Sequence, residues 1–340
     1  MKIAHKIETY TSDGEPVLRF TVMNSSGVYM EFTNWGARWI TASVPDVQGA
    51  LDNVLSGYDS LAGYLEDSNY MGATIGRFAN RIADASFTID RKTFHLEAND
   101  GNNTNHGGFS GFHNKVWQWE ELPDGIRFSL YSPDGEGGFP GNIRVITDYR
   151  FNEDNELSVR HYAETDCATY INMTNHAYFN LCGKGKKITE HRLHIPADRI
   201  LDTTPAFIPT GKRMNVKNTP FDFTSLKPIG TDLYADHEQL LWNKGYNHCY
   251  ILKDEISVEM LEAASLYEPV TGRNMTVMTD LPAVLLYTAG YYERPDTAVC
   301  LETQFYPDTP SHSDFPSCLV LPEKAYEHCT LFHFQVQKEE

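Results

Sequence analysis

The chain is dominated by short segments in which apolar and polar side chains alternate with a period of two residues, the pattern of half-buried β-strands. These segments are rich in Val, Ile, Thr, Phe and Tyr, and turn-forming clusters such as SSG, PDG and SPDGEGGFPGN separate them. Examples are Val17–Met23, Val28–Thr33, Arg38–Val44, Phe87–Ile89, Ile126–Tyr131, Arg144–Phe151, Leu157–Ala163 and Asn274–Thr279. The pattern predicts an all-β fold with a large β-sandwich core.

Helical patterns are few, and only Tyr58–Glu66 and Leu233–Trp242 are predicted as short helices. The 340 residues contain neither a fixed-period repeat nor a low-complexity linker, so we expect a single domain over residues 1–340. Trp35 and Trp39 lie four residues apart in NWGARWI. On one strand they would share a face, which predicts that both pack in the core.

The balance of charged residues narrows the range of partners. Lys and Arg total 28 and Asp and Glu total 46, a net charge of −18 with His neutral. We therefore expect no nucleic-acid partner and no anionic membrane, because both need a basic surface. A phosphorylated substrate stays open, since a local arginine cluster is enough to hold one.

Localisation follows from what the sequence does not contain. No apolar run reaches the length of a membrane span, and the start, MKIAHKIETYTSDGE, has no apolar core of a signal peptide. Six cysteines are scattered without a CxxC pair, which favours reduced thiols in a cytoplasmic protein. Of the 13 histidines only His191 and His194 are close and potentially convergent, without HExxH or Cys/His spacing. We predict no metal site, and a metal at this pair is the alternative.

The segment Thr297–Pro307, TAVCLETQFYP, carries a candidate general base. On a strand, Cys300, Glu302, Gln304 and Tyr306 share one face, with apolar residues on the other. A carboxylate held partly away from water has a tuned pKa and can act as a base. The alternative is a glutamate on a solvated strand face.

A distant segment, Ile171–Leu181 (INMTNHAYFNL), carries the complementary group. As a strand it places His176 in the middle of a polar face that also holds Asn172, Thr174, Tyr178 and Asn180. His176 and Glu302 from separate strands predict an acid and a base that flank one small molecule. A structural histidine on a wet face is the alternative.

Three further stretches carry polar groups that can bind a ligand. MGATIGRFANRI places Arg77 and Arg81 around Asn80 without a phosphate-loop pattern, so it is either an ion-pair hub or a hydroxyl-binding edge. The loop NDGNNTNHGGFSGF can bring His106 close to a ligand, or is a flexible surface loop. GYNHCYIL places Asn247 at a strand entrance, where an ordinary turn residue is the alternative.

Taken together, these motifs resemble the aldose 1-epimerase (galactose mutarotase) family. GATIGRFANRI, NHGG, SPDGEGGFPGN, TNHAYFNL, IPTG with TPFDF, GYNHCYIL and CLETQFYPDTP stand in the family's order, and the likeness covers nearly the whole chain. The resemblance implies a galactose mutarotase-like supersandwich that acts without a cofactor on a free monosaccharide, as a monomer or homodimer.

The resemblance also implies roles for single residues. Glu302 matches the family's general base and His176 its general acid. Sugar-contacting positions match Asn80, Arg81, His106, Tyr178, Asn247 and Leu285, whereas Arg77 is expected to hold the framework.

The sequence departs from the family at three positions: Asn247 stands where Asp is usual, Leu285 where Gln is usual, and Asn105 where Leu is usual. Asn247 still forms hydrogen bonds but carries no charge, and Leu285 forms none. A sugar hydroxyl left unpaired against Leu285 costs about 1–3 kcal/mol. We therefore expect intact acid–base chemistry with altered hydroxyl recognition.

Other functions fit parts of the same pattern. A non-catalytic sugar-binding protein on this fold keeps the pocket, and an epimerase of a different or phosphorylated sugar needs added cations. A glycoside hydrolase needs a second carboxylate that faces Glu302. Asp308 is close in sequence but is expected in a turn beyond Pro307.

Overall fold

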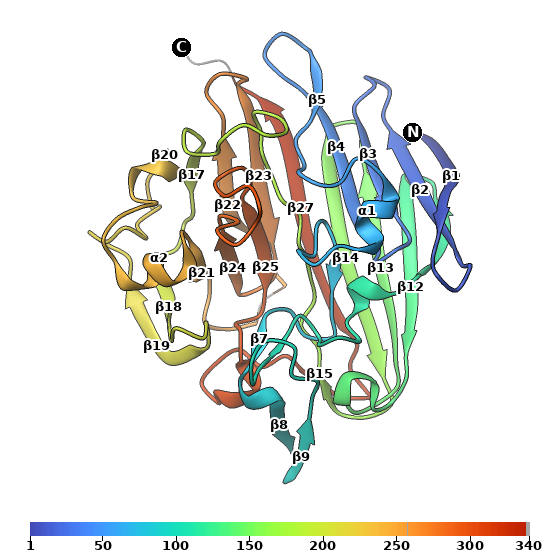
Figure 1. The fold of residues 1–340 in the computed structure, drawn as a ribbon, viewed down its shortest axis with the longest axis vertical. Helices are drawn as coiled ribbons and strands as arrows, with labels where there is room; N and C mark the ends of the chain where they lie inside the picture. Colours follow the sequence, from blue (N-terminus) through green and yellow to red (C-terminus); the bar gives the residue numbers. More distant parts are fainter. Residues whose placement is uncertain (257, 338–340) are drawn as a thin grey trace.

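A computed structural model describes residues 1–256 and 258–337, and its largest sheet has nine antiparallel strands within them. The sheet runs diagonally through the molecule behind the other strands (Figure 1). In spatial order its strands are β11 (Gln118–Leu122), β12 (Gly125–Ser132), β13 (Ile143–Phe151), β14 (Glu156–Thr165), β27 (Tyr326–Val336), β23 (Arg273–Thr279), β22 (Leu261–Tyr267), β17 (Arg192–His194) and β20 (Lys227–Pro228).

Two five-stranded antiparallel sheets form the other layer. The N-terminal sheet has the order β1 (Lys2–Tyr10), β2 (Pro16–Met23), β3 (Tyr29–Thr33), β4 (Arg38–Pro45) and β5 (Leu51–Asn53). The C-terminal sheet has the order β19 (Pro209–Asn215), β18 (Arg199–Thr203), β21 (Asn247–Ile251), β24 (Ala283–Tyr287) and β25 (Cys300–Gln304).

Both small sheets pack on the same face of the large one. On β27, the Phe332 ring lies 5.2 Å from the Trp39 ring of the N-terminal sheet. The Thr330 hydroxyl, two residues away on the same strand, hydrogen-bonds the Thr303 hydroxyl of the C-terminal sheet at 2.5 Å. Because residues two apart share a strand face, β27 contacts both sheets from one side. The predicted all-β sandwich is confirmed.

Short elements connect these layers, and in the described residues only two are α-helices. The helices are α1 (Leu61–Leu65) and α2 (Glu238–Asn243). The short strands pair as β6 (Thr74–Ile75) with β16 (Thr174–Asn175), β7 (Arg81–Ile82) with β10 (Thr104–Asn105), β8 (Ser86–Ile89) with β9 (Lys92–His95), and β15 (Thr169–Tyr170) with β26 (Leu319–Val320). Single turns of 3-10 helix cover Ala83–Ala85, Phe112–Asn114, Glu136–Gly138, Ile229–Thr231 and Thr309–Ser311. No helix in this part of the chain combines the length and apolar character needed to cross a membrane.

The eight strands given as examples match observed ones to within two residues at each end, whereas the predicted strand Thr297–Pro307 is observed only over Cys300–Gln304. Both helices are present but shorter than predicted. Helix α2 begins at Glu238 because residues 232–234 form a turn, and the His237 ring nitrogen accepts a hydrogen bond from the Gln239 backbone N–H at its start.

The prediction that Trp35 and Trp39 share a strand face is wrong. Residues 36–37 form a turn between β3 and β4, with φ of +68° at Gly36 and +42° at Ala37. Trp39 is therefore buried in the sandwich core. Trp35 is half-buried, and its indole N–H donates to the Tyr64 carbonyl at 2.9 Å.

The segment 171–181 is not the continuous strand that alternation predicts, since only Thr174–Asn175 form one. Its backbone forms hydrogen bonds with several different chain segments. For example, the His176 N–H donates to the Ala73 carbonyl, and Phe179 pairs with Val299. The alternation itself persists, because Met173, Ala177 and Phe179 lie in the core. The Asn172 and Asn180 amides donate to backbone carbonyls instead of lining an open polar face.

Candidate active site

The floor of the site is the outer face of the C-terminal sheet. Since Thr303 of β25 faces the large sheet, Glu302 points the other way. Strand register places two rows of side chains on this face. One row is Asn247, Tyr287 and Cys300, and the other is Cys249, Leu285 and Glu302.

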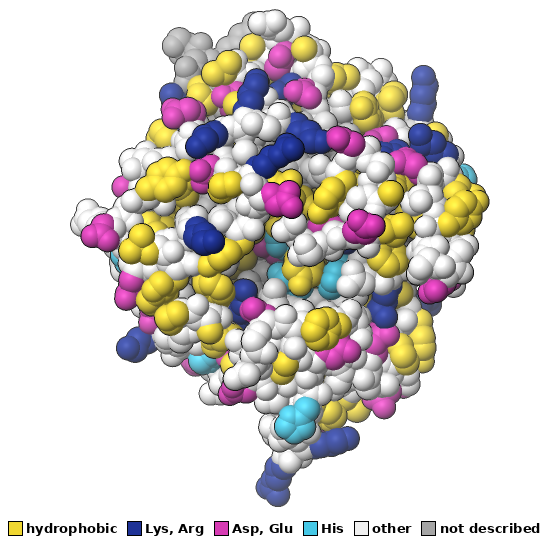
Figure 2. Space-filling model, in the orientation of Figure 1, with side chains coloured by type: hydrophobic (Ala, Val, Ile, Leu, Met, Phe, Trp, Pro, Cys, Tyr) yellow, Lys and Arg dark blue, Asp and Glu magenta, His cyan; other side chains and the backbone are white. Residues whose placement is uncertain are grey.

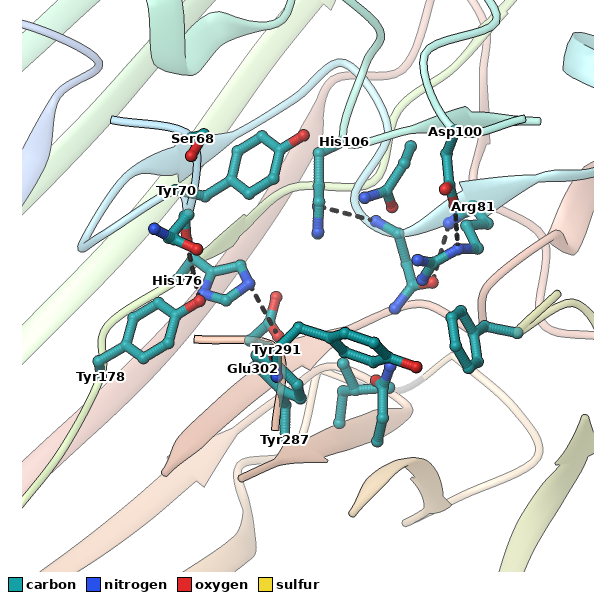
Figure 3. Close-up of a pocket in the computed structure, with 16 residues that line it drawn as sticks. Ser68, Tyr70, Arg81, Asp100, His106, His176, Tyr178, Tyr287, Tyr291 and Glu302 are labelled. Atoms are coloured by element: carbon teal, nitrogen blue, oxygen red, sulfur yellow. Dashed lines mark hydrogen bonds and ion pairs between the residues drawn. The ribbon is translucent and has the colours of Figure 1, made fainter. Parts of the chain in front are cut away.

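Loops from distant parts of the chain cover this floor and enclose a cavity of about 310 Å³. Figure 2 shows it as a hollow near the middle of one face, with histidine side chains visible at its bottom. All eight residues for which the sequence suggests a site role line this cavity: Asn80, Arg81, His106, His176, Tyr178, Asn247, Leu285 and Glu302. Figure 3 shows His106, His176 and Arg81 pointing inward from different segments.

The carboxyl group of Glu302 is buried beneath the cavity. Its side chain is 1% exposed, and neither oxygen has a hydrogen-bond partner in the described part of the chain. Its Oε1 lies 3.5 Å from His176 Nε2. Burial raises the pKa of Glu302 to about 8, against a smaller lowering by the Arg81 charge. Burial therefore favours the neutral form of this carboxyl group.

His176 is held between aromatic rings on one side of Glu302. The Tyr178 ring stacks on it at 5.0 Å and the Tyr70 ring lies 6.0 Å away (Figure 3). Its Nδ1 lies 3.6 Å from the Cys300 sulfur, and its backbone N–H donates to the Ala73 carbonyl. Burial lowers the pKa of His176 to about 4.

His106 presents a hydrogen-bond donor to the cavity. Its Nδ1 accepts a hydrogen bond from the Asn80 backbone N–H at 3.2 Å. The proton of the neutral ring therefore resides on Nε2. Burial lowers the pKa of His106 well below its usual value, so the ring stays neutral. Both residues adopt left-handed backbone conformations, with φ of +51° at His106 and +67° at Asn80. Such conformations cost energy and are common at binding sites.

Arg81 and Asp100 form an ion pair at the rim. Arg81 Nε donates to Asp100 Oδ2 at 2.7 Å, and its guanidinium lies 4.7 Å from the Phe207 ring centre (Figure 3). Asp100 is a second carboxylate in the cavity, and it is paired with Arg81. Asp308 does not line the cavity, because its carboxylate accepts hydrogen bonds from the Ala83 backbone and the Ser311 hydroxyl.

Arg77 lies outside the cavity, in the framework position expected of it. Its side chain is buried, and its guanidinium donates to Ser132 and to the carbonyls of Pro133 and Pro140. It thus ties the 72–82 segment to the turn after β12.

A metal ion could be held only at the site itself among the described residues. One ligand atom each from His106, His176 and Glu302 lie within 4.8 Å of one another, and two imidazoles with one carboxylate suit a transition metal. His191 and His194 do not converge: the first accepts from the Leu181 backbone N–H, and the second pairs with Glu262.

Sequence reasoning missed several residues that line the cavity: Ser68, Asn69, Tyr70, Asp100, Phe207, Tyr287 and Tyr291. Tyr287 could have been found, because it lies two residues from Leu285 in an alternating segment. Asp100 lies in the loop that was singled out for His106, although its own role was not predicted. The others come from turns and loops without a chemical motif, so no signal in the sequence pointed to them.

Comparison with known proteins identifies the group to which this architecture belongs. Residues 19–333 match the family model described as aldose 1-epimerase.

The chain belongs to the aldose 1-epimerase family.

Among its relatives in this family, the galactose mutarotase of Bos taurus is 36% identical over 328 residues, covering 92% of this chain and 93% of that protein. The aldose 1-epimerase of Escherichia coli K12 is 33% identical over 335 residues, covering 95% and 96%. The crystal structure of galactose 1-epimerase from Lactobacillus acidophilus NCFM superposes with a TM-score of 0.87 at 26% identity, covering 98% of this chain and 99% of that one. The chain is thus an isomerase of the epimerase family with the family's fold.

Proposed function

We propose that this chain interconverts the α and β anomers of a free aldose, with Glu302 as general base and His176 as general acid. The observation that carries the proposal is the pair itself: two buried titratable groups, 3.5 Å apart, at the bottom of a sugar-sized cavity. Within the described residues the carboxyl oxygens have no hydrogen-bond partner, so they are available to a substrate hydroxyl.

The chemistry requires one proton to be taken from the C1 hydroxyl and one to be given to the ring oxygen. Glu302 removes the first and His176 supplies the second, which opens the ring. Rotation about the C1–C2 bond and reversal of both transfers close the ring on the other face. Groups in such roles each contribute about 10²–10⁴-fold to the rate.

The pair must hold one proton in total for this exchange. The pKa values of about 4 and 8 give that state across the intervening pH range. Burial favours that proton on Glu302. A bound sugar donates hydroxyl hydrogen bonds to the carboxylate, which lowers its pKa and shifts the proton to His176.

The other lining groups suit hydroxyl binding. His106 offers an N–H donor, Asn80 and Asn247 offer amides, and Arg81 offers a charged edge. Within the described lining Arg81 is the single Lys or Arg, and Asp100 already pairs with it. This arrangement favours a neutral sugar over a phosphorylated one.

Polarimetry of freshly dissolved single anomers tests the proposal. Wild-type protein is expected to speed the approach to anomeric equilibrium, and Glu302→Gln and His176→Asn each to lower kcat by about 10²–10⁴-fold. Wild-type rates no faster than those of Glu302→Gln would instead support a non-catalytic sugar-binding protein.

A further inference from the structure

The side chains next to Glu302 on the floor of the cavity are apolar. Leu285 lies directly opposite Glu302 across β24 and β25, and Cys249 lies opposite Leu285 across β21 and β24. Leu201 of β18 packs in the same cluster. We call Leu285, Cys249 and Leu201 the apolar lane. Their side chains are 5%, 2% and 0% exposed, and they lead away from Glu302.

His176 lies on the opposite side of Glu302. Strand β25 is the edge of its sheet, with β24 on one side. The segment that carries His176 lies on the other side, where Phe179 bridges to Val299 and Cys300 contacts His176. Glu302 therefore stands between the acid and the apolar lane.

Because Glu302 lies between His176 and the apolar lane, the proposed roles of the two groups determine how a sugar ring lies in the cavity. In a cyclic aldose, C1 is bonded to its hydroxyl, to the ring oxygen and to C2. With Glu302 at the C1 hydroxyl and His176 at the ring oxygen, C2 lies on the far side from His176. A substituent on C2 then extends over Leu285 and along the lane.

Beside the apolar lane lies a polar side chain that is free to bind a ligand, that of Asn247. The half-buried Asn247 side chain lines the cavity beside Leu285 and has no hydrogen-bond partner in the described residues. Its carboxamide offers both a donor and an acceptor, which match the C=O and N–H of another amide. A side cavity of about 10 Å³ continues past it, between the lane and Phe207. That volume is close to the space of one water-sized sphere, so it suits a small terminal group.

We propose that the substrate is a 2-acetamido-2-deoxyaldose, whose amide pairs with Asn247 and whose methyl group packs on the apolar lane. The proposal rests on the acid and base roles given above. A plain 2-hydroxyl brings no apolar group onto the lane and sets a polar group over Leu285. A 2-deoxy sugar places no polar group over Leu285, but it leaves the Asn247 amide unpaired.

Anomer exchange measured by NMR tests the proposal with matched sugars. The 2-acetamido, 2-hydroxy and 2-deoxy forms are compared in both the gluco and galacto series, so that the configuration at C4 does not decide the outcome. We expect kcat/KM for the 2-acetamido form to exceed that of both others by at least about tenfold in one series. Equal or higher values for the 2-hydroxy or the 2-deoxy form in both series overturn the proposal.

Variants at position 285 locate the cause of the preference. Leu285→Gln restores a hydrogen-bonding floor and is expected to abolish the preference for the 2-acetamido form. Leu285→Met keeps the floor apolar and is expected to retain it. A preference that survives Leu285→Gln in a folded variant overturns the assignment.

Binding separates this proposal from the proposed catalysis. Saturation-transfer NMR on Glu302→Gln reports which sugar occupies the cavity without any turnover. Absence of anomer exchange for every sugar would refute the catalytic proposal, and preferential binding of the 2-acetamido form would still support the substrate class. A stronger saturation-transfer signal for the 2-hydroxy or 2-deoxy form, or no signal for the 2-acetamido form, overturns the proposed substrate class.

Discussion

Replacing Glu302 by Gln should make the protein more stable at the same time as it removes activity. The carboxyl group is fully buried and its oxygens have no hydrogen-bond partner in the described residues, and this raises its pKa from 4.5 to about 8. An acid whose pKa is higher in the folded chain binds its proton more tightly when folded. Stability is therefore lost as the pH rises from 4.5 towards 8.

The size of this loss follows from the two pKa values. One unit of difference corresponds to about 1.4 kcal/mol, so Glu302 costs about 1 kcal/mol at pH 5.5 and about 4 kcal/mol at pH 8. Gln is uncharged at both pH values. The free energy of unfolding of Glu302→Gln, relative to wild type, should therefore increase by about 3 kcal/mol between these pH values. His176 is present in both proteins, so its contribution to the pH dependence of the free energy of unfolding largely cancels in this comparison.

Equilibrium urea unfolding at pH 5.5 and pH 8 measures this difference. Glu323→Gln is the matched control, because Glu323 is exposed on the surface and its substitution should change stability by less than about 0.5 kcal/mol. If the free energy of unfolding of Glu302→Gln, relative to wild type, is the same at both pH values, the reasoning is refuted. That result would mean that the carboxyl group is already ionised in the folded protein at pH 5.5.

Three further predictions follow from the same structure. The pH profile of kcat/KM should be bell-shaped, falling below about pH 4 and above about pH 8 because the pair then holds two protons or none; a rate that keeps rising through pH 9 would contradict it. Incubation with EDTA followed by desalting should leave activity unchanged, because the proposed chemistry needs no ion at His106, His176 and Glu302; loss of activity that Zn²⁺ or Mn²⁺ restores would assign that cluster to a metal. Arg77→Ala should lower the free energy of unfolding by about 3 kcal/mol or more, since several buried carbonyl groups lose their donor. The KM of the folded fraction should stay within about threefold of wild type, and a large KM change with normal stability would place Arg77 at the substrate instead.

Much of the sandwich was predictable because strand alternation is a local property. Val17–Met23 and Asn274–Thr279 carry their burial pattern in consecutive side chains, and each became a strand close to the predicted bounds. Predictions failed where backbone pairing or a turn overrode the pattern. Trp35 and Trp39 were separated by a turn, and the 171–181 segment shares its hydrogen bonds among several partners.

By itself, the sequence determined the strands, the presence of a glutamate and a histidine within alternating segments, and the three departures at Asn105, Asn247 and Leu285. Only the tertiary structure decided that Glu302 is buried with no hydrogen-bond partner among the described residues, that Tyr70 and Tyr178 flank His176, and that an apolar lane begins beside the base. The reason is physical: alternation depends on neighbours along the chain, whereas burial and pKa depend on which distant loops close over the sheet.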